Sequence, residues 1–89
     1  MVKIVESSRF KKDIKRANKR GLKIAKLVKI VELLAQGKCL PERARPHLLS
    51  GEFKGVMECH ISPDWLLMYE VTSTEVRLYR TGTHADLFE

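Results

Sequence analysis

The stretch that decides the fold is KGVMECHISPDWLLMYEVTSTEVRLYRT, residues 54–81. Two short polar segments interrupt it, Ser62-Pro63-Asp64 and Thr72-Ser73-Thr74, and both have the residues of tight turns. The runs around them are rich in β-branched, aromatic and aliphatic residues, which predict strands over residues 54–61, 65–71 and 75–81. Strands joined so closely pair as antiparallel neighbours. This half of the chain therefore predicts an antiparallel meander.

The first half of the chain predicts one strand and two helices. Residues 3–6 are short and β-branched, as in a strand. Apolar residues recur at helical spacing through residues 9–20 and 24–35, and a glycine follows each run as a helix stop. Residues 38–52 predict a loop, and residues 85–89 a polar tail. The expected order is β-α-α-β-β-β. We predict one α+β domain over residues 1–89, with the helical hairpin on one face of a small, mostly antiparallel sheet and the other face open.

The composition excludes several classes of protein. The chain has 89 residues, 44% hydrophobic and 31% charged, which suits a single small domain and not a disordered segment. No apolar run reaches the roughly 18 to 20 residues of a membrane span, and residues 1–6 lack the features of a secretory signal. Cys39 and Cys59 have the wrong spacing for a disulfide scaffold or a zinc site. We expect a soluble, reduced, cytoplasmic protein without a cofactor, metal ion or membrane contact.

The positive charge is concentrated in the first half of the chain. The net charge is +6, but residues 1–46 carry 14 basic and 4 acidic residues, and residues 47–89 carry 3 and 7. Ten basic residues fall between Arg9 and Lys29, against the single acidic Asp13. A solvated amphipathic face is the alternative, but this excess favours contact with nucleic-acid phosphates. The residues predicted to contact RNA, alone or within a ribonucleoprotein, are Lys12, Lys15, Arg16, Lys19, Lys23, Lys26 and Lys54.

The three histidines are the first candidates for chemistry. His47 lies in the predicted loop, His60 ends a strand, and His84 follows the last strand. Adjacent strand ends in a meander converge, so the histidines can share one surface with Asp64 and Arg80. Histidine takes or gives a proton near neutrality, which attack by an RNA 2′-hydroxyl requires. The alternatives are exposed loop or strand-end histidines and a metal site, although no compact ligand spacing is present.

Two further residues, Arg80 and Phe88, each have two possible roles. Arg80 is a candidate for stabilising the extra charge on a phosphorane, or it forms an ion pair with Asp64, Glu70 or Asp86. Phe88 either docks into the core or stacks on a nucleobase.

Other residues with chemical potential are better explained by packing. Cys59 cannot readily use His60 as a base, because neighbours along a strand point to opposite faces; we predict that this cysteine is buried. Trp65 and Tyr69 share the strand parity of Leu67, so both are expected in the core.

Several motifs in order along the chain resemble one known group of proteins. They are His47-x-Leu49-x-Gly51, Glu58-Cys59-His60-Ile61, Pro63-Asp64-Trp65-Leu66-Leu67, Arg80-Thr81-Gly82-Thr83-His84 and Leu87-Phe88. In this order and spacing the chain resembles the YafQ-like branch of the RelE/ParE toxin superfamily. The N-terminal strand and basic hairpin match the same order.

The resemblance implies a type II toxin with a RelE-like domain. Such a toxin is a small endoribonuclease that enters the ribosomal A site and cuts the mRNA there. The implied partners are the 70S ribosome with its mRNA and a cognate antitoxin, and operator DNA is bound only through the antitoxin.

The resemblance also implies a set of catalytic positions. They fall on His47, His60, Asp64, Arg80, His84 and Phe88, and Glu58 stands where an acidic residue is also found. A metal-independent route would use His60 or His84 to take the 2′-hydroxyl proton and His47 or the other histidine to protonate the leaving oxygen. Asp64 is expected to orient His60. One departure is Val56-Met57 in place of a pair that contains arginine, which removes a phosphate contact.

Two other functions fit the same fold. A ParE-like toxin poisons DNA gyrase and cuts nothing, and an RNA-binding module would need the lysine-rich hairpin but not the histidines. The three histidines and the Gly82-Thr83-His84 ending favour the nuclease.

Overall fold

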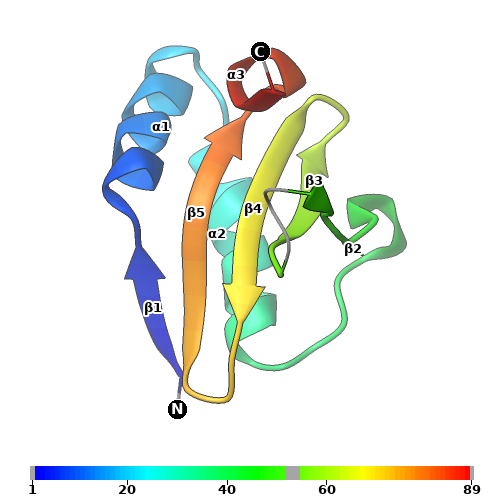
Figure 1. Ribbon diagram of the computed structural model, residues 1–89. Coiled ribbons are helices and arrows are strands. Elements are labelled where there is room, and N and C mark those ends of the chain that lie inside the picture. The colour runs from blue at the N-terminus through cyan, green and yellow to red at the C-terminus, as the bar shows by residue number, and fades with distance from the viewer. Residues whose placement is uncertain (1, 52–54, 89) are drawn as a thin grey trace.

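A five-stranded sheet in the order β1-β5-β4-β3-β2 supports the chain's candidate functional side chains (Figure 1). The computed structural model describes residues 2–51 and 55–88. Its elements are β1 (Lys3–Glu6), α1 (Ser8–Lys19), α2 (Ile24–Ala35), the 3-10 helix η1 (Glu42–Ala44), β2 (His47–Leu48), β3 (Met57–Ser62), β4 (Trp65–Val71), β5 (Glu75–Gly82) and α3 (His84–Phe88).

The sheet is mixed, with one parallel pair. β3, β4 and β5 form the predicted antiparallel meander, and β1 joins its edge parallel to β5. The helical hairpin leads from β1 across one face of the sheet to β2, and the meander then brings β5 back beside β1 in the same direction. The predicted α+β class and element order are therefore confirmed. β2 was expected to be loop and instead pairs with β3 over two residues.

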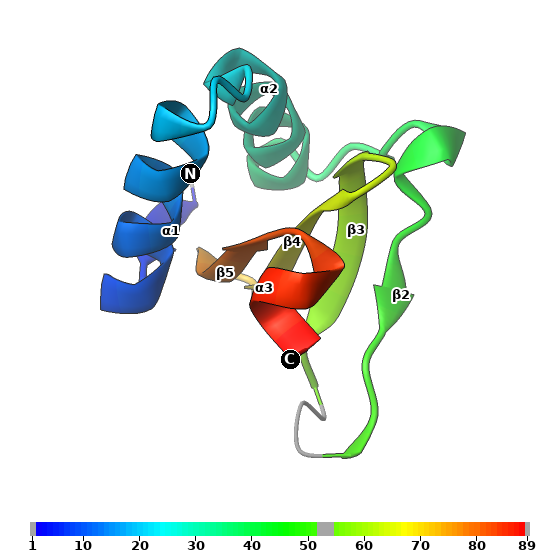
Figure 2. The ribbon, with the colours of Figure 1, turned by 90° about the horizontal axis from the view of Figure 1, so that it is seen from above.

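The helices α1 and α2 cover one face of the sheet (Figure 2). The side chain of Ser7 accepts a hydrogen bond from the backbone N–H of Phe10 and caps α1. The helices bury one apolar stripe each against the inward side chains of β3, β4 and β5. The core includes Phe10, Ala17, Leu27, Ile30, Leu34, Cys59, Trp65, Leu67, Tyr69, Val76 and Leu78.

Three core predictions are confirmed. Cys59 is fully buried, and burial raises the pKa of its thiol to about 12, so it is not a nucleophile at neutral pH. Trp65 and Tyr69 are both buried. The indole N–H of Trp65 donates to Thr81 Oγ1 at 2.9 Å, which satisfies the polar atom in the core.

The opposite face of the sheet, which we call the outer face, is partly covered. The prediction of an open face was wrong, because a second cluster of Leu66, Met68 and Leu87 buries part of it. Leu87 comes from α3, in the segment expected to be a polar tail. A reciprocal cap starts this helix: Asp86 accepts from the Thr83 N–H at 2.9 Å, and the Asp86 N–H donates to Thr83 Oγ1 at 3.1 Å.

Across the part of the chain that the structure describes, no helix is long and apolar enough to cross a membrane.

Candidate active site on the outer face of the sheet

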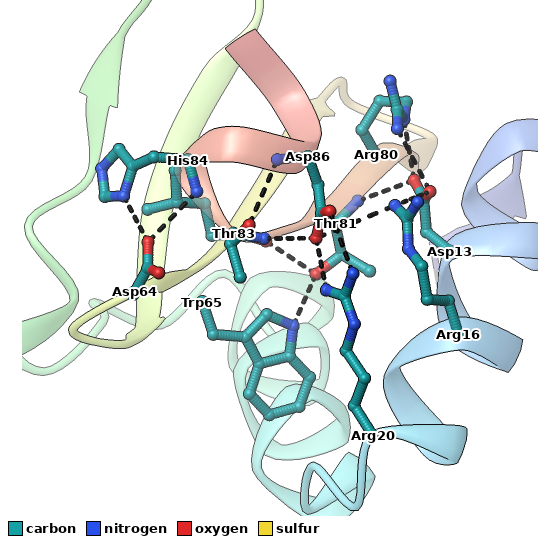
Figure 3. Close-up of polar contacts among 11 residues, drawn as sticks. Asp13, Arg16, Arg20, Asp64, Trp65, Arg80, Thr81, Thr83, His84 and Asp86 are labelled. Carbon is teal, nitrogen blue, oxygen red and sulfur yellow. Dashed lines mark hydrogen bonds and ion pairs between the residues drawn. The ribbon is translucent and has the colours of Figure 1, made fainter. Parts of the chain in front are cut away.

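The best-defined pair at the site joins His84 to Asp64 (Figure 3). Asp64 Oδ1 lies 2.6 Å from His84 Nδ1 and accepts from the His84 backbone N–H at 3.1 Å. These hydrogen bonds lower the pKa of the Asp64 carboxyl, so it is an ionised acceptor at neutral pH. Nδ1 must then carry a proton, which leaves Nε2 as the nitrogen able to exchange a proton with a substrate.

Asp64 therefore orients a different histidine from the one expected. The prediction that it orients His60 was wrong. The reason is the strand register: Leu66 pairs with Gly82, so the β3–β4 turn lies beside the start of α3.

His60 nevertheless lies next to the pair. Its ring centroid is 6.0 Å from that of His84, with the planes tilted by 50°. His60 also lines a cleft of about 420 Å³ together with Arg43 and Arg45. A smaller pocket that His60 also lines adds Lys26 and Lys29. Both cavities at this imidazole are thus lined by basic side chains, which would attract a phosphodiester.

His47 is held between two acceptors. It pairs with Glu58 across β2 and β3, and its Nε2 lies 3.3 Å from Glu58 Oε1. Its Nδ1 lies 3.1 Å from the carbonyl oxygen of Arg45. Both ring nitrogens of His47 therefore face hydrogen-bond acceptors, a carbonyl oxygen on one side and a carboxylate on the other. Glu58 is buried, and its Oε2 has no hydrogen-bond partner among the described residues.

Arg80 forms an ion pair that the sequence analysis did not consider. Its Nε donates to Asp13 Oδ2 at 2.8 Å and its Nη2 to Asp13 Oδ1 at 3.2 Å. The carboxylate raises the pKa of the guanidinium. None of the three expected partners hydrogen-bonds to Arg80: Asp64 pairs with His84, Glu70 with Arg77 and Tyr79, and Asp86 with Arg20.

Arg80 lines an open cleft of about 670 Å³ that we call the arginine groove. Arg9 and Arg16 reach the same cleft from α1, and Tyr79 and Met68 form part of its floor. Val56, half of the pair that the resemblance expects to contain an arginine, also lines this groove. The groove therefore keeps three guanidinium groups without that arginine. Met57, the other half, packs against the main core.

Asp86 ties the helix that starts at His84 to α1. Its carboxylate binds Arg20 at 2.6 and 3.2 Å and lies 3.9 Å from Arg16 Nη2. Arg20 holds the pKa of this carboxyl well below its usual range. Asp86 and Asp13 are the two positioning groups that sequence reasoning missed. The only signal for Asp13 was its isolation among ten basic residues.

The remaining predicted residues are Phe88 and the basic residues predicted to contact RNA. Phe88 is 46% exposed and its neighbour Leu87 is buried, so of the two alternatives left open for Phe88 the structure does not favour docking into the core. Stacking on a base stays a prediction. The α1 lysines are exposed, whereas Arg16 is engaged by Asp13. Lys54 lies outside the described residues. No cluster of three or more metal-ligating side chains occurs within residues 2–51 and 55–88. The exposed predicted lysines are Lys12, Lys15, Lys19, Lys23 and Lys26.

Comparisons with known proteins identify the family. The family described as "Bacterial toxin of type II toxin-antitoxin system, YafQ" matches residues 2–89. The chain belongs to this toxin family. The mRNA interferase toxin YafQ of Escherichia coli K12 is 41% identical over 83 residues, which cover 92% of this chain and 90% of the relative. The expected endoribonuclease class is thereby confirmed.

Solved structures of YafQ proteins confirm the RelE-like fold. The crystal structure of YafQ from E. coli BL21(DE3) is 38% identical and aligns over 100% of both chains with a TM-score of 0.93. The toxin in the crystal structure of the E. coli DinJ-YafQ toxin-antitoxin complex is 39% identical, with 99% and 98% coverage and a TM-score of 0.90.

Proposed function

We propose that this chain is a ribosome-dependent toxin that cleaves mRNA in the A site by attack of a ribose 2′-hydroxyl. The observation that carries this proposal is the Asp64–His84 pair, with a second imidazole 6.0 Å away. A buried or purely structural histidine would not be 56% exposed and oriented by a carboxylate. A gyrase poison would need no such proton-transfer group.

Each ring nitrogen's surroundings suggest a role. His84 Nε2 takes the proton from the 2′-hydroxyl, while Asp64 stabilises the imidazolium that forms. The 2′-oxygen attacks the adjacent phosphorus, and the bond from phosphorus to the 5′-oxygen breaks. His47, which Glu58 and the carbonyl of Arg45 hold in place, donates a proton to the departing 5′-oxygen. The products are a 2′,3′-cyclic phosphate and a 5′-hydroxyl.

The remaining residues bind the substrate and its charge. Arg80 stabilises the additional negative charge on the phosphorane, and Phe88 stacks on a base beside His84. The exposed lysines of the hairpin contact ribosomal RNA. This route draws on side chains alone and requires neither a metal ion nor a cofactor.

The natural inhibitor is a cognate antitoxin. The E. coli YafQ relative was crystallised in complex with the antitoxin DinJ. In this chain residues 1–46 carry 14 basic and 4 acidic residues, which attract an acidic and partly disordered partner segment. We propose that this segment covers the histidines and Arg80, and that operator DNA is contacted only through the antitoxin.

The test is cleavage of mRNA on translating ribosomes, with the ends mapped. His84→Ala should lower single-turnover cleavage by roughly 10² to 10⁴, the usual contribution of positioned proton transfer. It should also lose one limb of the pH profile while ribosome binding changes little. Ser73→Ala is a matched control, because Ser73 is exposed in the β4–β5 turn at the far end of the sheet from α3 (Figure 1).

Two results would contradict the proposal. A His84→Ala variant that cuts normally would remove this imidazole from the chemistry. A wild-type protein that leaves mRNA intact but inhibits gyrase would make the chain a ParE-like toxin.

A further inference from the structure

Asp13 is a carboxylate buried inside the most basic part of the chain. It lies on the inner side of α1 and is only 5% exposed. Its two oxygens accept from Arg80 at 2.8 and 3.2 Å, from Arg16 at 3.0 Å and from the Thr81 backbone N–H at 3.2 Å (Figure 3). Burying a carboxylate is costly unless several donors compensate it. The donors therefore stabilise the charge of this carboxylate, and the carboxylate in turn holds the donors in place.

The geometry divides the Arg80 guanidinium into two edges. Asp13 takes the Nε–H and one N–H of Nη2. A guanidinium has five N–H donors, so three remain for another acceptor. The side chain is 19% exposed and lines the arginine groove with Arg9 and Arg16. One edge is thus held by protein, and the remaining donors stay available to a ligand in the groove.

Arg16 is oriented by the same carboxylate. Its Nη2 lies 3.0 Å from Asp13 Oδ1 and 3.9 Å from Asp86 Oδ2, and 41% of its side chain is exposed. A single buried group therefore aligns two guanidinium groups along one cleft. Two aligned guanidinium groups suit a phosphate, whose oxygens accept hydrogen bonds from several directions.

We propose that Asp13 is a positioning residue for cleavage: it holds Arg80 and Arg16 so that their remaining N–H groups bind an RNA phosphate in the arginine groove. The inference rests on the proposed function, because the phosphate is that of the substrate. Asp13 itself touches neither the substrate nor the reacting atoms. Its effect passes mainly through Arg80, which donates two hydrogen bonds to it, and to a lesser degree through Arg16, which donates one.

A double-mutant cycle on single-turnover cleavage tests this route. Asp13→Asn keeps the size of the side chain but replaces an acceptor oxygen by an NH₂ group that faces Arg80. It should slow the cleavage step by roughly 10- to 100-fold, the effect of a small misplacement, and change ribosome affinity less than about threefold. In an Arg80→Gln background the same change should cost several-fold less than in the wild type, because its main route is gone and only Arg16 remains. Glu32→Gln, an exposed carboxylate of α2, is the matched control.

A nuclear magnetic resonance measurement decides the positioning without relying on cleavage. The Nε–H signal of Arg80 should persist in the wild type and shift when an uncleavable 2′-O-methyl RNA oligonucleotide is added. In Asp13→Asn this signal should be lost to exchange with water. If Asp13→Asn fails to fold, Asp13→Glu keeps the charge and should move the same signal, because its carboxylate reaches further by one methylene.

Three outcomes would overturn the inference. The first is that the losses in cleavage rate from Asp13→Asn and Arg80→Gln multiply in the double variant. The second is that the Nε–H signal of Arg80 is unchanged in both Asp13 variants. The third is that RNA does not shift this signal in the wild type. A wild type that fails to cut mRNA on ribosomes would refute the proposed function instead, while the resonance would still report whether Asp13 orients Arg80.

Discussion

Gly82 joins β5 to the helix that begins at His84, and Asp86 occupies the space that a side chain would need. Gly82 has φ of +157°, and a Cβ there would lie 2.8 Å from both Cβ and Oδ2 of Asp86. Asp86 cannot readily move aside, because Oδ2 binds Arg20 at 2.6 Å and the Thr83 N–H at 2.9 Å. Gly82→Ala should therefore displace the carboxylate that anchors α3.

The size of the effect follows from four contributions. Overpacking costs about 1 to 3 kcal/mol, and a lost helix cap costs about 0.5 to 2 kcal/mol. Backbone strain at the positive φ costs about 1 to 3 kcal/mol for a residue with a Cβ, and the lower entropy of the unfolded alanine chain offsets about 0.4 to 1 kcal/mol. We expect a net loss of about 4 kcal/mol in the free energy of unfolding. For a domain of this size that corresponds to a fall of ~16 to 32 °C in Tm.

Denaturant unfolding and thermal melts measure this loss. Gly21→Ala is the control, because Gly21 has φ of +79° with nothing within 4 Å of the added Cβ. Its free energy of unfolding should fall by about 1 to 2 kcal/mol, the cost of backbone strain alone. In an Asp86→Ala background Gly82→Ala should cost at least about 1 kcal/mol less than in the wild type, because the obstacle is removed. An equal cost in both backgrounds would refute the reasoning.

Two further predictions concern the charged hairpin and the thiols. Replacing Lys12, Lys15 and Lys19 of α1 together by glutamine should weaken ribosome binding and make the affinity less dependent on salt. An unchanged salt dependence would mean that these lysines are only solvated. A thiol reagent at pH 8 should modify the exposed Cys39 and leave Cys59 intact in the folded protein, because burial raises the pKa of Cys59 to about 12; fast reaction of both thiols in folded protein would contradict the packing.

The meander and the helical hairpin were predictable because their signals are local. Hydrophobic periodicity and turn residues lie within each element, and the chain folds accordingly over β3 to β5 and α1 to α2. β2 has only two residues, His47 and Leu48, too few to show a period. α3 depends on the cap between Thr83 and Asp86. Short elements of this kind exist because of their partners, so their own sequence carries little signal.

The sequence selects candidate members of the site, which stay a prediction, but it does not give their pairings. The histidines, Asp64 and Arg80 could be selected from their chemistry and from the convergence of strand ends. The partner of Asp64 depends on the register between β4 and β5, which the sequence pattern leaves open. The partner of Arg80 lies 67 residues away on α1. Such long-range pairs arise from tertiary packing, and a single sequence gives no local sign of them.

The basic residues of α1 show why a count of charge misleads. Arg16 and Arg20 bind the carboxylates of Asp13 and Asp86, whereas the α1 lysines point into solvent. Part of the positive charge in this segment is therefore paired with carboxylates inside the fold. These carboxylates also hold Arg80 and the start of the helix that begins at His84. Replacing Arg20 should then disturb the proposed catalytic centre around His84 more than the overall affinity for RNA. Replacing an α1 lysine should do the reverse, although both changes remove the same formal charge.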